Sequence, residues 1–239
     1  MKGRAPEKRA AAERVLLQMK NVKCVFEQKG GIEGELRLRK LVHLGGEDRT
    51  LTTHRENGCA FKVDVARCYF SPRLSTERLR IAEAVGGNER VLNMFAGVGP
   101  FSIEIAKERR ARVTSCELNP YACRLHMENN RMNKVEGLVE VIQADAKRLP
   151  DLLDQGFDRI LMPHPSASNR FLDAALRPLA EHGTIHYYRH VLARNETEAA
   201  AAVGGELEGL LGRGWKWGVR RVREVGPRWM EMAAEIRRD

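Results

Sequence analysis

One segment near the middle of the chain constrains the fold more than any other. The apolar run VLNMF (91–95) leads directly into AGVGP (96–100). The run predicts a buried strand, the two glycines allow a tight turn that approaches a ligand closely, and Pro100 suits the first turn of a helix. A strand that enters a helix through such a turn is typical of a nucleotide-binding βαβ unit.

The rest of residues 75–239 continues this alternation of strand and helix. Apolar runs predict strands at 90–95, 112–118, 138–144, 157–162 and 183–191. Helical spacing predicts helices at 102–110, 121–133, 146–155, 169–181 and 196–214, and two strands follow at 216–225 and 230–237. This order predicts an α/β fold: a doubly wound, Rossmann-like and largely parallel sheet, with the last strand inserted antiparallel.

The first third has a different pattern. Helical spacing predicts a helix over 6–19, and four strands without helices between them are expected at 22–28, 34–44, 49–57 and 60–70. Glycine-containing turns separate these strands, so we expect one antiparallel sheet in a small α+β module. The expected domains are therefore an N-terminal α+β module (1–74) and a Rossmann-like domain (75–239).

Acidic residues follow the glycine turn at positions that suit a nucleoside. Glu117 ends the second strand and can accept hydrogen bonds from ribose hydroxyls, although a helix N-terminal charge is the alternative. Asp145 follows the third strand and either receives an adenine amino group or caps a helix. The turn lacks the third glycine of the dinucleotide fingerprint, so we expect S-adenosylmethionine rather than NAD. The residues expected to bind it are Phe95, Ala96, Gly97, Gly99, Glu117, Leu118, Asn119, Asp145, Ala146 and Pro163.

Charge and composition limit the partners and the compartment. The net charge is +9, and residues 1–80 hold 18 Lys and Arg against 10 Asp and Glu. Such a basic third suits a polyanion such as RNA, although it also suits a well-solvated surface. The five cysteines form no CxxC pair, which argues against a zinc site or a disulfide framework. No apolar run is long enough to span a bilayer and the basic N-terminus has no apolar signal region, so we expect a cytoplasmic protein without metal.

Several segments together resemble the archaeal and eukaryotic-type tRNA guanine-37 N1-methyltransferase family. They are NMFAGVGPFSIEIAK, ELNPYACRLHMENNRMNKV, DRILM, GTIHYY, and HRENG followed by FKVDVARCYFSPRLSTERLRIAE. The segment FSPRLSTER (70–78) is the discriminating one, because a sister family, the wybutosine-pathway aminocarboxypropyl transferase, differs there. The resemblance implies a class I methyltransferase that uses S-adenosylmethionine, acts on N1 of guanosine 37, and has tRNA as its partner.

The resemblance also implies site residues. It assigns the general base to Glu77, and a carboxylate shielded by a nucleobase would have a raised pKa. It assigns stabilisation of charge on O6 to Arg37 on the module's sheet, with Arg39 as an alternative register. Tyr69, Arg73 and Arg78 flank Glu77 and are expected to contact tRNA or the target base. Without the resemblance, Glu77 and Arg37 would be read as a helix N-terminal acid and an exposed strand residue.

The chain departs from the family pattern in three places. The family has Asn-x-Pro-Pro or Asn-Leu-Pro after the fourth strand, and this chain has Pro163-His164-Pro165. Pro165 matches and is expected to contact the substrate, whereas Pro163 removes a donor. His164 reads as a surface-loop residue, with contact to the substrate as the alternative. Asn93 replaces a common aspartate. The family's N-terminal domain, which grips the outer corner of tRNA, is expected to be missing.

The sequence is compatible with two other functions. The Pro163 substitution is compatible with an aminocarboxypropyl transferase that acts on a tricyclic guanine. The missing domain is compatible with an RNA-binding module whose cofactor pocket is vestigial. The sequence is silent on oligomeric state, and we favour a monomer.

Overall fold

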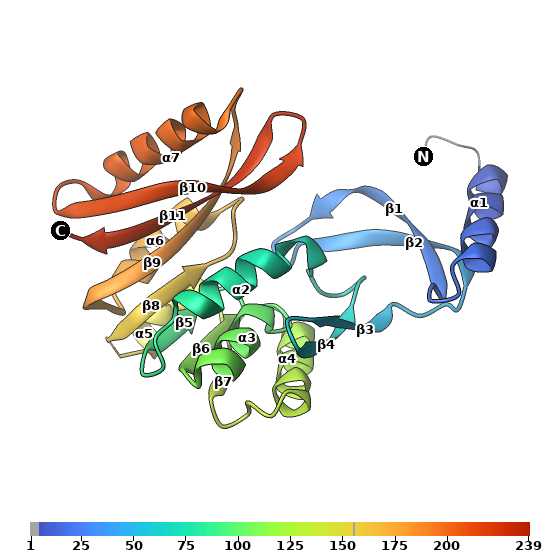
Figure 1. The fold of residues 1–239 in the computed structure, drawn as a ribbon, viewed down its shortest axis with the longest axis horizontal. Helices are drawn as coiled ribbons and strands as arrows, with labels where there is room; N and C mark the ends of the chain where they lie inside the picture. Colours follow the sequence, from blue (N-terminus) through green and yellow to red (C-terminus); the bar gives the residue numbers. More distant parts are fainter. Residues whose placement is uncertain (1–4, 155) are drawn as a thin grey trace.

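The computed structural model describes residues 5–154 and 156–239, without the side chains of 32 and 33. Figure 1 shows a small N-terminal module that extends to one side of a larger layered domain. The module begins with a helix that packs on a long hairpin, and a second, shorter hairpin follows. These elements are α1 (Ala5–Gln18), β1 (Cys24–Glu33), β2 (Leu38–Gly46), β3 (Leu51–Glu56) and β4 (Cys59–Asp64).

The predicted small α+β module with antiparallel strands is confirmed, but its four strands form two separate hairpins rather than one sheet. Among the described residues, β1 pairs only with β2 and β3 only with β4, both antiparallel. The outer edge of β4 is bonded by the larger domain. The backbone N–H groups of Ala60 and Lys62 donate to the side-chain oxygens of Asn133 and Asn129, at 2.9 and 2.7 Å. Asn129 of a later helix and Asn133, which caps that helix, thus satisfy this edge and fix the short hairpin to the larger domain.

The larger domain is built on a seven-stranded sheet in the order β10-β11-β9-β8-β5-β6-β7. β5 to β9 run parallel, and β11 lies antiparallel between β9 and β10. This confirms the predicted Rossmann-like sheet with an antiparallel insertion. The strands are β5 (Arg90–Asn93), β6 (Arg112–Glu117), β7 (Val139–Gln143), β8 (Phe157–Met162), β9 (Leu179–Leu192), β10 (Trp215–Gly226) and β11 (Trp229–Arg238).

Helices cover the two faces of this sheet (Figure 1). Residues 169–181 differ from the expected single helix, because β9 already begins at Leu179. Pro178 precedes it, and its carbonyl accepts the N–H groups of Gly156 and Phe157. The helix expected over 146–155 ends at Leu152, and Gln155 lies outside the described residues. The helices are η1 (Pro72–Leu74), α2 (Ser75–Ala84), α3 (Pro100–Arg109), α4 (Pro120–Met132), η2 (Ala146–Arg148), α5 (Leu149–Leu152), η3 (Ser168–Arg170), α6 (Leu172–Leu176) and α7 (Glu196–Leu211).

Two hydrophobic clusters form the core, and neighbouring residues of β5 belong to different ones. Leu92 belongs to the cluster with α7, and Val91 to the cluster with α3, as expected when successive side chains of a strand point to opposite faces. Phe61 and Val63 of β4 are buried in the α3 cluster. The short hairpin therefore packs on the larger domain, and the division at residue 74 stays a prediction.

A buried pair of carboxylates lies where this hairpin meets α2 and α3. Glu104 accepts a hydrogen bond from Asn57 at 2.7 Å, and Arg78 pairs with Glu56 while lying 3.4 Å from Glu104. Burial, assisted by the charge of Glu56, raises the pKa of Glu104 to about 8, against Asn57 and Arg78, which lower it. Glu104 therefore holds a proton in the folded chain at neutral pH.

This proton gives a prediction about stability. In the unfolded chain the pKa of a glutamate is about 4.3. Between that pH and the raised pKa of Glu104, the folded chain binds a proton that the unfolded chain lacks. The free energy of unfolding should fall as pH rises through this window and then level off. Glu104→Gln should make that fall shallower, and urea unfolding at several pH values measures it. Glu108→Gln, an exposed site on the same helix, should leave the slope unchanged. A Glu104→Gln slope equal to that of the parent chain would contradict the assignment.

Candidate functional site

The turn after β5 is held by a carboxylate from the next strand. Gly97 adopts a left-handed conformation (φ 56°), and its N–H donates to Glu117 Oε2 at 2.6 Å. The N–H of Asn119 donates to the other oxygen at 2.8 Å. Burial raises the pKa of Glu117, and the backbone N–H groups of Asn119 and Gly97 oppose that shift. The carboxylate has further lone pairs, so it can still accept from ribose hydroxyls.

Gly99 completes the turn and leaves no room for a side chain. Its φ of 92° is a left-handed conformation, and its N–H donates to Ala96 O at 3.0 Å. A Cβ at this position would overlap the ring of His126, which is fully buried on α4. The turn therefore needs glycine here for two independent reasons, backbone conformation and packing.

Gly99→Ala should destabilise the fold. Left-handed strain alone costs about 1–3 kcal/mol, and the overlap with His126 adds to it. Urea unfolding measures the loss. Gly137→Ala is the matched control, since a Cβ there meets nothing and its φ is not positive. Adding His126→Ala to Gly99→Ala should recover only the part due to overlap. A Gly99→Ala chain as stable as the Gly137→Ala chain would contradict this account.

A cavity of about 510 Å³ opens beside the turn, at the carboxyl edge of the parallel strands. It is lined by most of the residues expected to bind the cofactor, namely Phe95, Gly97, Glu117, Leu118, Asn119, Asp145, Ala146 and Pro163. Ala96 and Gly99 do not line it, and they shape the turn instead. The aromatic rings of Phe95 and Phe171 meet edge to face at 4.9 Å in its wall. The cavity thus combines two carboxylates with an apolar wall.

Asn119 and Asp145 have structural duties as well. The Asn119 side chain caps α4 by accepting from the N–H groups of Tyr121 and Ala122, and it donates to Arg67 O at 2.7 Å. The Asp145 carboxylate accepts from Lys147 N at 2.9 Å and caps η2. The helix-cap alternative for Asp145 is therefore realised, and the residue also lines the cavity.

The N-terminal module closes one side of the cavity. Residues 34–37 form the turn between β1 and β2 and line the cavity together with Tyr69. The expectation of Arg37 on a strand is corrected, because β2 begins only at Leu38 and Arg37 has a φ of 54° in the turn. The Arg37 guanidinium lies 4.3 Å from the centre of the Tyr69 ring. Arg39 lies 5.6 Å from that ring and donates to Phe70 O, outside the lining.

The Pro163-His164-Pro165 run lies at the end of β8. The expectation of His164 as a surface-loop residue is wrong, because it lines the cavity with its ring 5.0 Å from that of Phe95. Burial lowers the pKa of His164, and its Nδ1 has no hydrogen-bond partner among the described residues. Pro163 lines the cavity, whereas Pro165 does not. The Pro165 carbonyl instead accepts a hydrogen bond from the N–H of His190.

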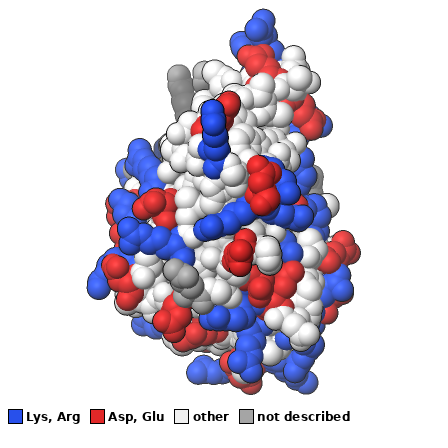
Figure 2. All heavy atoms as spheres, turned by 90° about the vertical axis from the view of Figure 1, so that its left-hand side faces the viewer, with Lys and Arg blue, Asp and Glu red and all other residues white. Residues whose placement is uncertain are grey.

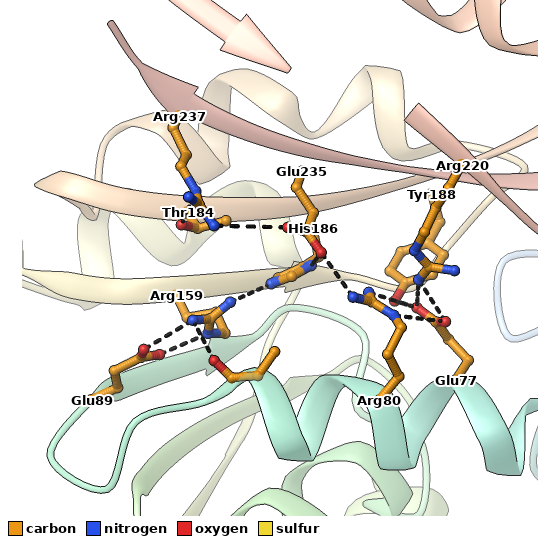
Figure 3. Close-up of polar contacts among 11 residues, drawn as sticks. Glu77, Arg80, Glu89, Arg159, Thr184, His186, Tyr188, Arg220, Glu235 and Arg237 are labelled. Atoms are coloured by element: carbon orange, nitrogen blue, oxygen red, sulfur yellow. Dashed lines mark hydrogen bonds and ion pairs between the residues drawn. The ribbon is translucent and has the colours of Figure 1, made fainter. Parts of the chain in front are cut away.

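Glu77 lies apart from this cavity. It sits in the first turn of α2, is buried, and faces the C-terminal strands, as Figure 3 shows. Burial acts to raise the pKa of Glu77, but hydrogen bonds from Arg80, Arg220 and Tyr188 outweigh it and hold the pKa below its usual range. The raised pKa expected from the sequence is therefore absent in the chain without RNA, and the structure does not bring Glu77 and Arg37 together.

The two flanking arginines differ in exposure. Arg73 is exposed in η1 and free to meet a polyanion. Arg78 is buried, pairs with Glu56 and donates to Ser71 O at 3.2 Å. This burial leaves Arg78 no surface for RNA, so the expected contact is corrected to a structural role. On the face drawn in Figure 2, basic side chains are interspersed with acidic ones, and they form no uniform patch there.

Sequence reasoning missed the partners of Glu77 and the module turn over the cavity. Arg80 carried a local signal, because it is three residues after Glu77 on a helix. Tyr188 and Arg220 carried none, since they lie 111 and 143 residues away along the chain. Within the described part of the chain, no helix could cross a membrane and no cluster of His, Cys, Asp or Glu suits a metal ion.

Comparison with known proteins relates this chain to a group of tRNA-modifying enzymes. The TRM5/TYW2 methyltransferase domain matches residues 52–202. The tRNA (guanine(37)-N(1))-methyltransferase Trm5b of Pyrococcus abyssi is 39% identical over 225 residues, which are 91% of this chain and 64% of that protein. The tRNA 4-demethylwyosine(37)-methyltransferase Taw21 of Saccharolobus solfataricus is 33% identical over 95% of this chain and 84% of that protein. The chain thus spans about two thirds of the Trm5b relative.

Solved structures give the same picture. A complex of aTrm5 with tRNALeu superposes with a TM-score of 0.87 at 34% identity, covering 99% of this chain and 67% of that one. The M. jannaschii protein TYW2 in complex with AdoMet superposes with a TM-score of 0.70 at 31% identity, covering 83% of this chain and 91% of that one. The match to aTrm5 includes the N-terminal module and the sheet together.

Proposed function

Because the chain belongs to the TRM5/TYW2 methyltransferase family, we propose that it transfers a methyl group from S-adenosylmethionine to N1 of guanosine 37 in tRNA. The observation that carries this proposal is the composition of the cavity. One wall comes from the glycine turn and its carboxylates, and the other comes from the module turn with Arg37 over Tyr69. A methyl donor and a nucleobase can therefore meet between the two parts of the chain.

The residues present fit S-adenosylmethionine. The Glu117 carboxylate, already oriented by two backbone N–H groups, would accept from the ribose hydroxyls, and Asp145 would accept from the adenine amino group. Leu118 and Ala146 would contact the adenine, and Phe95 would face the sulfonium cation. The bound cofactor supplies an electrophilic methyl carbon, and the pair of electrons of the broken carbon–sulfur bond stays on sulfur.

The target base needs two further groups. N1 of guanine bears a proton and becomes nucleophilic only as that proton leaves. Arg37 would stabilise the negative charge that grows on O6, at the mouth of the cavity where the Tyr69 ring supports its guanidinium. Glu77 would take the proton, which requires that the base and Glu77, now apart from the cavity, come together and that its carboxylate exchange one of its present partners for the base. Pro163 and His164 would bound the base on its other side.

The proposed partner is tRNA, and the solved aTrm5 complex with tRNALeu supports that choice. The exposed Arg73 and the excess of basic residues in 1–80 suit the phosphate backbone. A contact with phosphates should weaken steeply with salt, whereas binding of the cofactor in its cavity should not.

The identity of the modified nucleoside tests this function. The chain is incubated with methyl-labelled S-adenosylmethionine and an unmodified tRNA transcript that bears G37, and the digested RNA is separated into nucleosides. We expect label in 1-methylguanosine, and none when G37 is replaced by adenosine. Label in any other nucleoside, or cofactor binding by calorimetry without transfer, would overturn the proposal.

The similarity to Taw21 and TYW2 supports a second candidate, transfer to a tricyclic guanine at position 37. Pro163 in place of asparagine, beside the half-buried His164, alters the wall that a base would meet. Two cofactor samples, one labelled in the methyl group and one in the aminocarboxypropyl carbons, separate methyl transfer from aminocarboxypropyl transfer. A tRNA carrying 4-demethylwyosine compared with one carrying guanosine then separates the two substrates.

A further inference from the structure

Glu77 is surrounded by donors from three different elements. The Tyr188 hydroxyl on β9 donates to Oε1 at 2.6 Å, and the Arg80 guanidinium on α2 donates to both oxygens at 3.2 Å. Arg220 on β10 also reaches both oxygens, at 2.6 Å to Oε2. Figure 3 shows the carboxylate enclosed between the helix and the C-terminal strands. These donors from three elements therefore converge on one buried negative charge.

The residues packed behind Arg80 form further ion pairs within the fold. Arg80 continues to Glu235 on β11 at 2.8 Å, and His186 on β9 lies 3.7 Å from the same glutamate. On its far side His186 meets Arg159, which pairs with Glu89 (Figure 3). Burial and the surrounding arginines lower the pKa of His186, so it is neutral. Among the groups packed round Glu77, Arg80 and Arg220 are thus its cationic partners, and Arg80 is shared with Glu235.

Among the partners of Glu77, Arg220 is the one that can move away with the smallest loss of buried packing. Its side chain is 34% exposed, against 5% for Glu77, and Tyr188 is fully buried. It extends from β10, an edge strand of the sheet, and its Nε has no partner among the described residues. A carboxylate that accepts from all these donors offers no free lone pair to a nucleobase. Proton transfer to Glu77 therefore requires that a donor withdraw, and Arg220 can do so without unpacking the core.

We propose that Arg220 is a positioning residue, which holds the Glu77 carboxylate ionised and oriented in the free protein and yields it to the nucleobase when tRNA binds. This inference rests on the proposed function, in which the N1 proton of guanine moves to Glu77. When Arg220 withdraws, its guanidinium is free to meet a phosphate of the RNA, which matches it in geometry and charge. The C-terminal hairpin thus couples RNA binding to the freeing of the Glu77 carboxylate, which then acts as the general base.

The pH dependence of methyl transfer distinguishes this role from a merely structural one. An adjacent cation typically lowers a carboxylate pKa by about 1–3 units. Arg220→Gln should therefore move the acidic limb of the second-order rate constant, measured at subsaturating tRNA so that it reports the free protein, to higher pH by about that much. Arg220→Lys keeps the charge and should keep the limb close to that of the parent chain. Tyr188→Phe removes a neutral donor and should move the limb in the same direction by less. A structural defect would lower the rate equally at every pH.

The matched control is Arg221→Gln, the next residue on β10. Arg221 is exposed and pairs with Glu196 and Glu224, away from Glu77, so its profile should equal that of the parent chain. A parent-like limb in Arg220→Gln, in a parent chain that does form 1-methylguanosine, would overturn the role of Arg220. A parent chain that forms no 1-methylguanosine would instead overturn the proposed function. If Arg220→Gln does not fold, Arg220→Met, which keeps the aliphatic stem and also lacks the charge, takes its place in the same measurement.

Discussion

Replacing Glu77 with glutamine is expected to lower the rate of methyl transfer by about 10²- to 10⁴-fold, the usual contribution of a positioned general base. Glutamine has nearly the same shape but cannot take the N1 proton. The affinity for S-adenosylmethionine should stay within about twofold, because Glu77 does not line the cavity. Single-turnover rates with a G37 transcript and calorimetry with the cofactor measure the two quantities.

The interpretation needs a control for stability, because the change removes a buried charge from two guanidinium groups. Loss of one partner of a buried ion pair can cost about 3–5 kcal/mol. Thermal unfolding of Glu77→Gln is therefore compared with Glu83→Gln, an exposed glutamate on the same helix that should behave like the parent chain. A Glu77→Gln chain that is folded, binds the cofactor and methylates at the parent rate would exclude Glu77 as the base.

Arg37→Ala should reduce the rate by about 10²- to 10³-fold, the usual effect of removing one donor that stabilises a developing anion. Its guanidinium stands over Tyr69 in the cavity wall, where charge on O6 would appear. The loss should fall mainly on the maximal single-turnover rate, because the interaction strengthens only as the charge develops.

Arg39→Ala is the matched control, since Arg39 belongs to the same hairpin and also lies near Tyr69 but outside the cavity lining. We expect it to change the rate by less than about tenfold. A larger loss in Arg39→Ala than in Arg37→Ala would show that the other register is the correct one. If Arg37→Ala greatly raised the tRNA concentration that gives half of the maximal rate, and left the maximal rate unchanged, Arg37 would instead be a binding residue.

The parts of the fold that depend on local sequence could be predicted. The glycine turn is one example, because Gly97 and Gly99 adopt left-handed conformations whose need for glycine is visible in the sequence. The antiparallel insertion of the last strand also followed from the order of elements. What failed depends on distant contacts. The attachment of the short hairpin to the larger domain is an example, because Asn129 and Asn133 bond the outer edge of β4 from a helix and its C-terminal cap far along the chain.

The candidate site shows the same division. Glu117 could be placed from its position at the end of a strand, and it lines the cavity as expected. The surroundings of Glu77 could not, because Tyr188 and Arg220 come from strands that the chain reaches only much later. His164 was misjudged because a loop with two prolines reads as surface, whereas its ring packs against Phe95.

The position of β11 has a consequence for how the protein is made. This strand follows both of its neighbours in the sequence, yet it lies between β9 and β10 and contributes Glu235. While the ribosome is still translating residues 229–238, β9 and β10 have no partner between them, and Arg80 lacks its second anion. Assembly of the proton-accepting end of the molecule must therefore wait until residues 229–238 have been made, and nascent chains stalled before this strand should expose unpaired edges of β9 and β10 to chaperones.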